Sequence, residues 1–433
     1  MKTHPLLDRL DWIDSAPAFG FVEALGMGFV RASGPSAALG HLCKIDVVAG
    51  EPATAEIVAA DNRGITLVPL DGEGGFRLGA RVTATITDDR SSAGGGFAGR
   101  AVDALGRAID GGAPPSIDRS GETGMTAALD RVSPTEILAT GIRAIDGLLT
   151  LGVGQRIGIF AASGVGKTSL IEQLARQVDC DRCVLCLVGE RGREVSALWD
   201  LARATGRPGR FTMVAATSDE SPVMRARSVE QALALAEYWR GRGEHVLLLI
   251  DSITRLAMAL REIGLAAGAP PTVRAYTPNV FAALPRIVER CGAVRGGGSI
   301  TAIMTVLSET DDVDDPIVEV MKSLLDGHIV LSRGLADQGH FPAIDIVRSI
   351  SRQAVRLMAP DHARAARETV AILAAYEENR IMIDSGVYRA RSSDRIDRAI
   401  SLRDPIAAFL RQPADEAVDF DAAVRALKTS GVV

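Results

Sequence analysis

A Gly-rich stretch that ends in Lys and Thr contains the residue types that could do chemistry most directly. Residues 161–168 read AASGVGKT, which fits the pattern G-x-x-x-x-G-K-[ST] with Ala161 at the first Gly position. In this pattern the backbone N–H groups of a tight turn converge on an anion, at the positive end of the following helix. Lys167 would reach the terminal phosphates of a nucleotide, and the Thr168 hydroxyl would bind Mg²⁺. The predicted phosphate-contacting residues are Ser163, Gly164, Val165, Gly166, Lys167, Thr168 and Ser169.

The residues on either side have the pattern that such a turn requires. IGIF, residues 157–160, is a short apolar run that indicates a buried strand. After the turn, apolar residues return at helical spacing at Leu170, Ile171, Leu174 and Val178. A purely structural turn would leave the consecutive Lys and Thr unexplained, so the context favours a nucleotide phosphate site.

Two acidic residues at the ends of apolar runs are candidates for the rest of a hydrolytic site. Hydrolysis also needs an acid that orients the metal, a group that activates water, and positive charge for the transition state. Asp251 ends the run HVLLLID, where it either contacts Mg²⁺, through water, or caps the next helix. Glu190, in LVGERGREV, either polarises the attacking water or is a solvated loop residue. Spacing alone does not single out an Arg for the positive charge.

Four segments would position these residues. Residues 20–90 contain short β-like runs, such as TAEIVAA and GITLVPL, between Gly, Pro and Asp turns, which is typical of a small β-barrel. Residues 91–352 begin with the linker-like SSAGGGFAG, and from about residue 137 apolar strands alternate with helical segments, as in a parallel α/β sheet. Residues 353–433 are Ala- and Arg-rich with helical periodicity. The remaining segment is residues 1–19.

The N-terminal segment is predicted to be amphipathic. LLDRLDWI places Leu6, Leu10 and Ile13 on one face of a helix. This face either docks a partner protein or packs against the chain's own barrel, and the sequence leaves both alternatives open.

Composition limits the class of protein. The sequence of 433 residues is 47% hydrophobic and has a formal net charge of −6, which gives no general attraction to nucleic acid. It contains no apolar run of about 20 residues that would span a bilayer and no signal-peptide core near Met1, so we expect a cytoplasmic protein. Its five cysteines suit a reducing compartment. Cys180, Cys183 and Cys186 follow C-x-x-C-x-x-C, which indicates either buried thiols or, less simply, a metal site.

Several longer motifs resemble those of the rotary-type hexameric ATPases. These motifs are GIFAASGVGKTSL, LVGERGREV, LLLIDSITRLAMALREIGLAAGAPP, YTPNVFAALPRIVERCG and DGHIVLSRGLADQGHFPAIDIVRSISR. The sequence resembles most the flagellar protein export ATPases and their virulence type III secretion relatives, over nearly its whole length. The resemblance implies an N-terminal β-barrel, a central RecA-like phosphate-loop domain with a mainly parallel sheet, and a helical C-terminal domain. It also implies Mg²⁺-dependent ATP hydrolysis.

The resemblance assigns expected roles to residues that spacing leaves open. Glu190 matches the family's catalytic glutamate and Asp251 its second-motif aspartate. Arg191 and Arg255 match charged positions around the γ-phosphate. Arg352, in SISRQ, matches the arginine finger that enters the neighbouring subunit's site.

Two further positions concern nucleotide affinity. Phe341 falls where the family stacks an aromatic ring on adenine, and Phe in place of the commoner Tyr keeps the stacking face. Ala162 replaces a frequent Gly in the phosphate loop, which would weaken binding if that position needs a positive φ or close phosphate approach.

The resemblance also implies partners. Because one chain carries the phosphate loop, Glu190 and Arg352, identical subunits can complete one another's sites in a closed ring, which the family implies is a homohexamer. The family further implies a stalk or regulator protein at the N-terminus, export chaperones and substrates, and an export gate at the inner membrane, with this protein on its cytoplasmic side.

Four alternatives remain open, and each would require different features of the sequence. The C-terminal stretch GVYRARSSDRIDRAI into FLRQ resembles the export ATPases and lacks the acidic lever of the rotary synthase catalytic subunit. The phosphate loop and this ending favour the flagellar over the virulence branch. A hexameric RNA translocase would carry a basic, aromatic N-terminal domain, whereas residues 20–90 hold nine acidic and six basic side chains. A binding protein without turnover would not need Lys167, Glu190 and Asp251 together.

Overall fold

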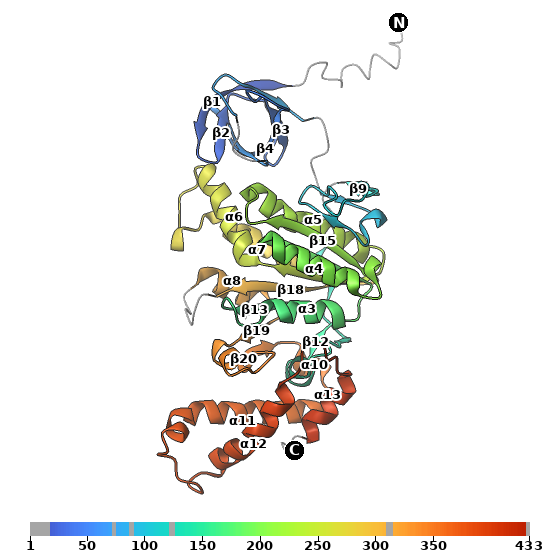
Figure 1. Ribbon diagram of the computed structural model, residues 1–433, viewed down its shortest axis with the longest axis vertical. Coiled ribbons are helices and arrows are strands. Elements are labelled where there is room, and N and C mark those ends of the chain that lie inside the picture. The colour runs from blue at the N-terminus through green and yellow to red at the C-terminus, as the bar shows by residue number, and fades with distance from the viewer. Residues whose placement is uncertain (1–17, 72–74, 86–90, 121–125, 309–314, 430–433) are drawn as a thin grey trace.

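The computed structural model describes residues 18–71, 75–85, 91–120, 126–308 and 315–429. A small β-barrel, an α/β layer and a set of C-terminal helices follow one another along the long axis of the molecule (Figure 1). The predicted fold class is therefore confirmed. Residues 1–17 of the predicted amphipathic segment lie outside the described part of the chain.

The N-terminal barrel is closed by antiparallel pairing of its first and last strands. The strands lie in the order β1-β2-β5-β4-β3-β6, and Phe19 of β1 pairs with Thr83 of β6. Alternate residues point inward, as period-two strands require, and the interior holds buried side chains such as Ile57 and Leu67. The strands are β1 (Phe19–Gly26), β2 (Phe29–Ala32), β3 (Leu42–Ile45), β4 (Ala53–Asp61), β5 (Gly64–Pro69) and β6 (Arg81–Ala84).

The central layer is a mostly parallel sheet with the strand order β20-β19-β13-β18-β16-β14-β15-β8. Its inner strands are almost wholly apolar because helices cover both faces. Only the β19/β20 pair on this path is antiparallel within the described residues. The strands are β8 (Ala101–Val102), β13 (Arg156–Ala161), β14 (Arg182–Glu190), β15 (Phe211–Thr217), β16 (His245–Asp251), β18 (Ser299–Leu307), β19 (Gly327–Leu331) and β20 (Ile344–Ser351).

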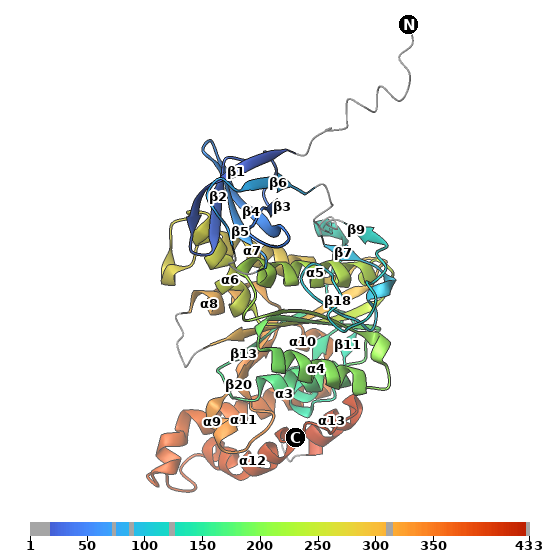
Figure 2. The same cartoon turned by 45° about the horizontal axis from the view of Figure 1, so that its top comes forward.

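Helices pack against both faces of this sheet and bury two hydrophobic clusters (Figure 2). One face is covered by α3 (Lys167–Gln177) and α4 (Gly192–Ala204), and the other by α5 (Pro222–Arg240), α6 (Ile253–Ala266) and α7 (Pro278–Arg290). The layer also contains α8 (Pro316–Leu324), α9 (Arg333–Asp337) and α10 (Ala354–Leu357). Short strands complete it: β7 (Ser92–Ala93), β9 (Arg119–Ser120), β10 (Arg131–Val132), β11 (Ile137–Leu138), β12 (Leu151–Gly152) and β17 (Gly292–Val294).

The C-terminal helices pack on the α3 side of the sheet. They are α11 (Pro360–Asp384), α12 (Asp394–Leu410) and α13 (Phe420–Leu427), and α13 contacts α2 (Arg143–Leu148). Buried residues of these helices, such as Ile406 and Leu427, belong to the same hydrophobic cluster as Leu174 of α3. Within the described ranges, none of the helices has the length and apolar character needed to cross a membrane.

The three closely spaced cysteines are buried thiols in or beside β14. Burial raises the pKa of Cys180 to about 11 and that of Cys186 to about 12, and the Cys186 thiol donates to the Ser228 carbonyl over 3.6 Å. Among the residues that the structure describes, no cluster of three His, Cys, Asp or Glu is arranged to hold a metal ion.

Candidate active site

The phosphate loop connects β13 to α3 at the carboxyl end of the sheet. Gly164 and Gly166 adopt left-handed φ angles of 79° and 93°, which residues with a Cβ rarely adopt. No side chain caps the N-terminus of α3, so its first N–H groups remain available to an anion. Ala162 is not among the described non-Gly residues with positive φ, so replacing Gly there introduces no backbone strain. Ser163, Gly164, Thr168 and Ser169 are exposed, whereas Val165 is buried.

Both acidic candidates lie beside this loop because β14 and β16 are neighbouring parallel strands. Leu187 of β14 is paired with Asp251 of β16, so the carboxyl ends of the two strands meet at one edge. The exposed fractions of Glu190 and Asp251 are only 5% and 7%. Lys167 lies between the two carboxylates: it is ion-paired with Asp251, and its Nζ is 3.7 Å from Glu190 Oε1. The fold thus gathers one cation and two acids from three separate segments.

Two further side chains hold these carboxylates in place. Arg255, on α6, lies with its Nε 3.1 Å from Glu190 Oε1. Thr305, near the carboxyl end of β18, donates to Asp251 Oδ1 over 2.7 Å. Thr305 carried no expected role, and its only signal in the sequence is a hydroxyl inside the apolar run SITAIMTVL.

The environment of Glu190 disfavours its ionised form. Burial raises the pKa of Glu190, and the neighbouring charge of Asp251 raises it further, while Lys167 and Arg255 act in the opposite direction. The net result is a pKa above the usual range for Glu. A carboxylate tuned upward in this way is better suited to accept a proton near neutral pH.

Arg191 and Phe341 occupy the margins of the site. Arg191 is exposed at the N-cap position of α4, one residue after Glu190. The Phe341 ring lies against the phosphate loop, since a Cβ placed on Gly166 would be 3.4 Å from it. Its exposed fraction is 46%, so the side chain is accessible to a ligand. Arg333, at the start of α9, donates to the Ser163 carbonyl over 3.3 Å.

Arg352 is the one expected site residue that the fold does not bring to this edge. It follows β20, whose last residue Ser351 pairs with Gly327 at the start of β19. Since β19 runs parallel to β13, Arg352 lies at the amino edge of the sheet, whereas the phosphate loop lies at the carboxyl edge. The guanidinium is exposed and donates to the Lys322 carbonyl over 3.1 Å.

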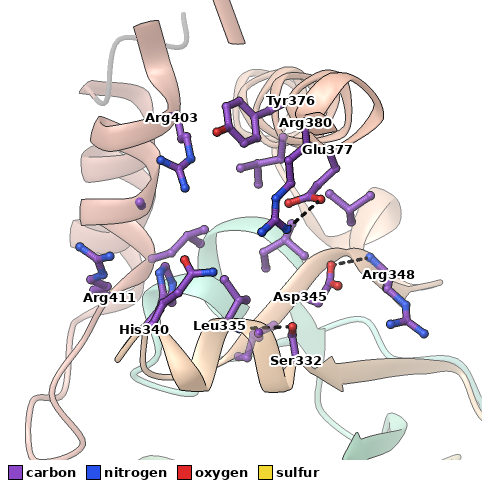
Figure 3. A pocket seen from close by; sticks show the side chains of 18 of the residues that line it. Ser332, Leu335, His340, Asp345, Arg348, Tyr376, Glu377, Arg380, Arg403 and Arg411 are labelled. Carbon is purple, nitrogen blue, oxygen red and sulfur yellow. Dashed lines mark hydrogen bonds and ion pairs between the residues drawn. The ribbon is translucent and has the colours of Figure 1, made fainter. Parts of the chain in front are cut away.

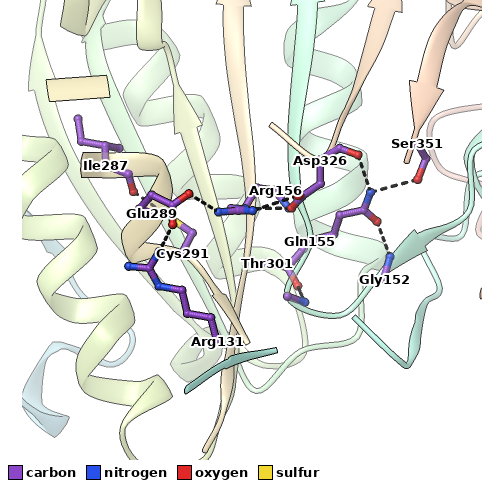
Figure 4. Close-up of polar contacts among 11 residues, drawn as sticks. Arg131, Gly152, Gln155, Arg156, Ile287, Glu289, Cys291, Thr301, Asp326 and Ser351 are labelled. Carbon is purple, nitrogen blue, oxygen red and sulfur yellow. Dashed lines mark hydrogen bonds and ion pairs between the residues drawn. The ribbon is translucent and has the colours of Figure 1, made fainter. Parts of the chain in front are cut away.

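A polar network fixes the backbone next to Arg352 (Figure 4). The Arg352 N–H donates to the Asp326 carbonyl over 2.9 Å. The Asp326 carboxylate in turn accepts two hydrogen bonds from the Arg156 guanidinium, at 2.9 and 3.0 Å. Gln155 donates to Ser351 Oγ over 3.1 Å and accepts from the Gly152 N–H. Arg352 therefore projects from a rigid edge of the molecule and not from a loose loop.

A phosphate loop between a parallel strand and a helix, with buried carboxylates at the ends of nearby strands, defines a phosphate-loop nucleotide-binding protein of the RecA-like class. Residues 141–351 match the ATP synthase alpha/beta family nucleotide-binding domain, and residues 358–429 match the T3SS EscN ATPase C-terminal domain. Over nearly its whole length the chain is also 40% identical to a flagellum-specific ATP synthase and 41% identical to a type 3 secretion system ATPase. It therefore belongs to the family of flagellum-specific and type III secretion ATPases, and it is an ATPase, as the sequence motifs indicated.

The relatives span the full chain. The flagellum-specific ATP synthase of Bacillus subtilis is 40% identical over 99% of this chain and 98% of its own length. The type 3 secretion system ATPase of Pseudomonas syringae pv. tomato is 41% identical over 95% of this chain and 93% of its own. Among solved structures, the assembled ATPase EscN from enteropathogenic E. coli superposes with a TM-score of 0.90 at 36% identity, covering 96% of this chain and 100% of EscN.

Proposed function

We propose that this protein hydrolyses ATP with Mg²⁺ at the site formed by the phosphate loop, Glu190 and Asp251. The observation that carries the proposal is the convergence of Lys167, Glu190 and Asp251 beside an uncapped helix N-terminus. Bound phosphates would replace the two carboxylates as partners of Lys167. The other proposed phosphate contacts are the N–H groups of residues 163–169.

The oxygen groups at the site fit Mg²⁺, which prefers hydroxyl, carboxylate, water and phosphate oxygens. The Thr168 hydroxyl is exposed at the start of α3, and the Asp251 carboxylate is held by Thr305 at the end of β16. Thr168 would bind the ion directly and Asp251 through water. When bound, Mg²⁺ neutralises charge on the phosphate oxygens.

Glu190 is the proposed group that polarises the attacking water. Its buried position beside the phosphate loop and its raised pKa support this role. Arg255, which pairs with Glu190, and Arg191 next to it are proposed to stabilise charge around the γ-phosphate. Phe341, whose side chain is exposed, is proposed to stack on adenine.

The site is proposed to be completed by Arg352 of a neighbouring subunit. The position of Arg352 at the opposite edge of the sheet from its own phosphate loop supports this arrangement. A contact between unlike surfaces that closes on itself produces a ring, and EscN has been solved in an assembled form. We therefore propose a homohexamer as the active state.

The biological role that the relatives support best is to energise protein export by a flagellar type III secretion apparatus. Flagellum-specific relatives at 40% to 42% identity support the flagellar branch, and a virulence secretion role is the second candidate because secretion ATPases reach 41%. EscN in complex with its central stalk EscO supports a stalk partner here, which we place at the N-terminus. Export chaperones, substrates and a gate at the cytoplasmic side of the inner membrane would be the other partners.

Affinity purification of the tagged full-length protein from its native cells tests this role. Co-purification of a stalk protein, chaperones and flagellar gate components is the expected result. Recovery of injectisome components would replace the flagellar assignment by the virulence one. Recovery of RNA or of ATP synthase subunits would contradict the export role and leave the hydrolytic site untouched.

A further inference from the structure

A pocket of about 530 Å³ lies between the α9–β20 segment and the helices α11 and α12 (Figure 3), within the size range of small-molecule sites. None of the residues that line it belongs to the phosphate loop. Its apolar wall includes side chains from the α9–β20 segment and from the C-terminal helices, among them Leu335, Ile344, Leu373, Tyr376 and Leu410. The pocket is therefore built at a domain junction, where small-molecule sites are frequent.

The rim of this junction pocket carries more cationic than anionic side chains. Its lining includes four arginines and three acids. Arg411 has no carboxylate within 4 Å in the described part of the chain, although Arg143 donates to its backbone carbonyl. Arg403 lies 4.8 Å from the centroid of the Tyr376 ring, and its ion pair with the exposed Asp404 is long, at 3.9 Å. Two guanidinium groups therefore retain donors for an anionic ligand.

His340 supplies an independent sign of a ligand. Its exposed fraction is 5%, and its Nε2 has no hydrogen-bond partner among the described residues. Burial and the nearby Arg411 lower the pKa of His340, which keeps the ring neutral at pH 7. A buried polar nitrogen without a partner is costly, and a polar group of a bound molecule would satisfy it.

Two residues that line the pocket are each followed in the chain by a residue outside its lining, and these two followers are bonded to each other. His340 precedes Phe341, and Arg411 precedes Gln412. The Gln412 N–H donates to the Phe341 carbonyl over 2.9 Å, and the buried Gln412 side chain is itself fixed by the Gly141 carbonyl at 2.7 Å. A molecule that displaces His340 or Arg411 would therefore displace the backbone that carries the Phe341 ring.

We propose that the junction pocket binds a small amphipathic anion, an aromatic or branched apolar body bearing a carboxylate or phosphate, and that its binding is coupled to nucleotide affinity. The apolar body would lie against Leu373 and Tyr376, and the anion would pair with Arg403 and Arg411. The coupling, but not the binding, rests on the proposed role of Phe341.

The binding is tested on the full-length protein without nucleotide, with ligand-observed NMR titration of naphthalene-1-acetate, 1-naphthyl phosphate and the neutral 1-naphthaleneethanol. We expect the wild-type protein to bind at least one of the two anions saturably. The affinity for the alcohol should be at least about tenfold lower, and so should the affinity of the double variant Arg403→Gln, Arg411→Gln for the anion. The matched control is Arg395→Gln, on the same helix but outside the pocket, which should bind normally. Tighter binding of the acetate assigns a carboxylate, and tighter binding of the phosphate assigns a phosphate ligand.

Absence of saturable binding, equal affinity for the alcohol, or equal loss in Arg395→Gln would overturn the proposal. His340→Phe adds a second check. It replaces the imidazole by an apolar ring and should lower the affinity for the anion severalfold. The coupling is measured as the shift in the dissociation constant of fluorescent ADP at saturating anion, which must equal the reciprocal shift in anion affinity. Anion binding without any shift would reject the coupling, whereas failure of ADP to bind at all would reject the nucleotide site and not the pocket.

Discussion

Arg352 and Lys167 lie at opposite edges of the same sheet. Lys167 follows the carboxyl end of β13, whereas Arg352 follows β20 beside the start of β19. A six-residue strand such as β13 is about 20 Å long, and both residues are held by defined neighbours. An Arg352 that acts on phosphate at Lys167 must therefore come from another subunit.

Arg352→Ala is expected to bind ATP with near-normal affinity and to lose roughly 10³-fold in turnover, because the guanidinium acts on transition-state charge. Steady-state hydrolysis and binding of a fluorescent nucleotide measure the two effects. Arg348→Ala, within β20 and four residues before Arg352, is the control for loss of one Arg from this segment. Near-normal hydrolysis by Arg352→Ala would show that Arg352 does not act in the site.

Asp326→Ala is expected to lower kcat about tenfold or more without changing nucleotide affinity, because small misplacements of a catalytic group have large effects. The variant keeps the Asp326 carbonyl that accepts from the Arg352 N–H. It removes the carboxylate that anchors this segment to the Arg156 guanidinium. Glu378→Ala, which removes an exposed ion pair with Arg395, should leave kcat unchanged. A loss of nucleotide affinity in Asp326→Ala would indicate a general structural effect instead.

Glu190→Gln is expected to lower kcat by about 10²-fold or more while nucleotide binding persists. The same substitution should raise the thermal stability of the nucleotide-free protein by a few degrees at pH 8. The raised pKa means that the ionised carboxylate is less stable in the fold than in the unfolded chain. This cost is fully present above the folded pKa and disappears as the pH falls toward about 4.3, the ordinary value for Glu.

The upward direction of the Glu190 pKa shift predicts how stability and activity depend on pH. Wild-type and Glu190→Gln melting temperatures should converge as the pH is lowered, because wild-type Glu190 is then protonated too. The acid limb of kcat/KM for the wild type should lie at a higher pH than an ordinary Glu would give. A stability difference that stays constant from pH 8 to pH 5 would contradict the raised pKa.

Phe341→Ala is expected to raise the KM for ATP roughly tenfold, since base stacking on an aromatic ring contributes about 1–3 kcal/mol, and to leave kcat near normal. Phe341→Tyr keeps the stacking face and should stay within about twofold of the wild type. Steady-state kinetics with ATP measure both variants. An unchanged KM for Phe341→Ala would show that adenine does not contact this ring.

The sequence allows the phosphate loop and both acids to be located because their signals are local. The loop is a consecutive motif, and Glu190 and Asp251 each end an apolar run, so parallel pairing brings them to one edge whatever the connecting segments are. The role of Thr305 could not be predicted from the sequence because a hydroxyl inside a buried strand has no distinctive spacing. The role of Arg352 could be expected only from family resemblance, since it depends on a second copy of the chain. The junction pocket combines α9, β20, α11 and α12 and has no linear signature.

Mixing Lys167→Ala and Arg352→Ala subunits before ring assembly tests the shared site most directly. Each variant alone should be inactive, whereas a random ring contains about a quarter of sites with an intact phosphate loop from one subunit and an intact Arg352 from the next. We predict that the equimolar mixture regains hydrolysis approaching that fraction of the wild-type rate, with both variants assembling as rings. A mixture no more active than the sum of the separate variants would contradict a site completed by the neighbouring subunit.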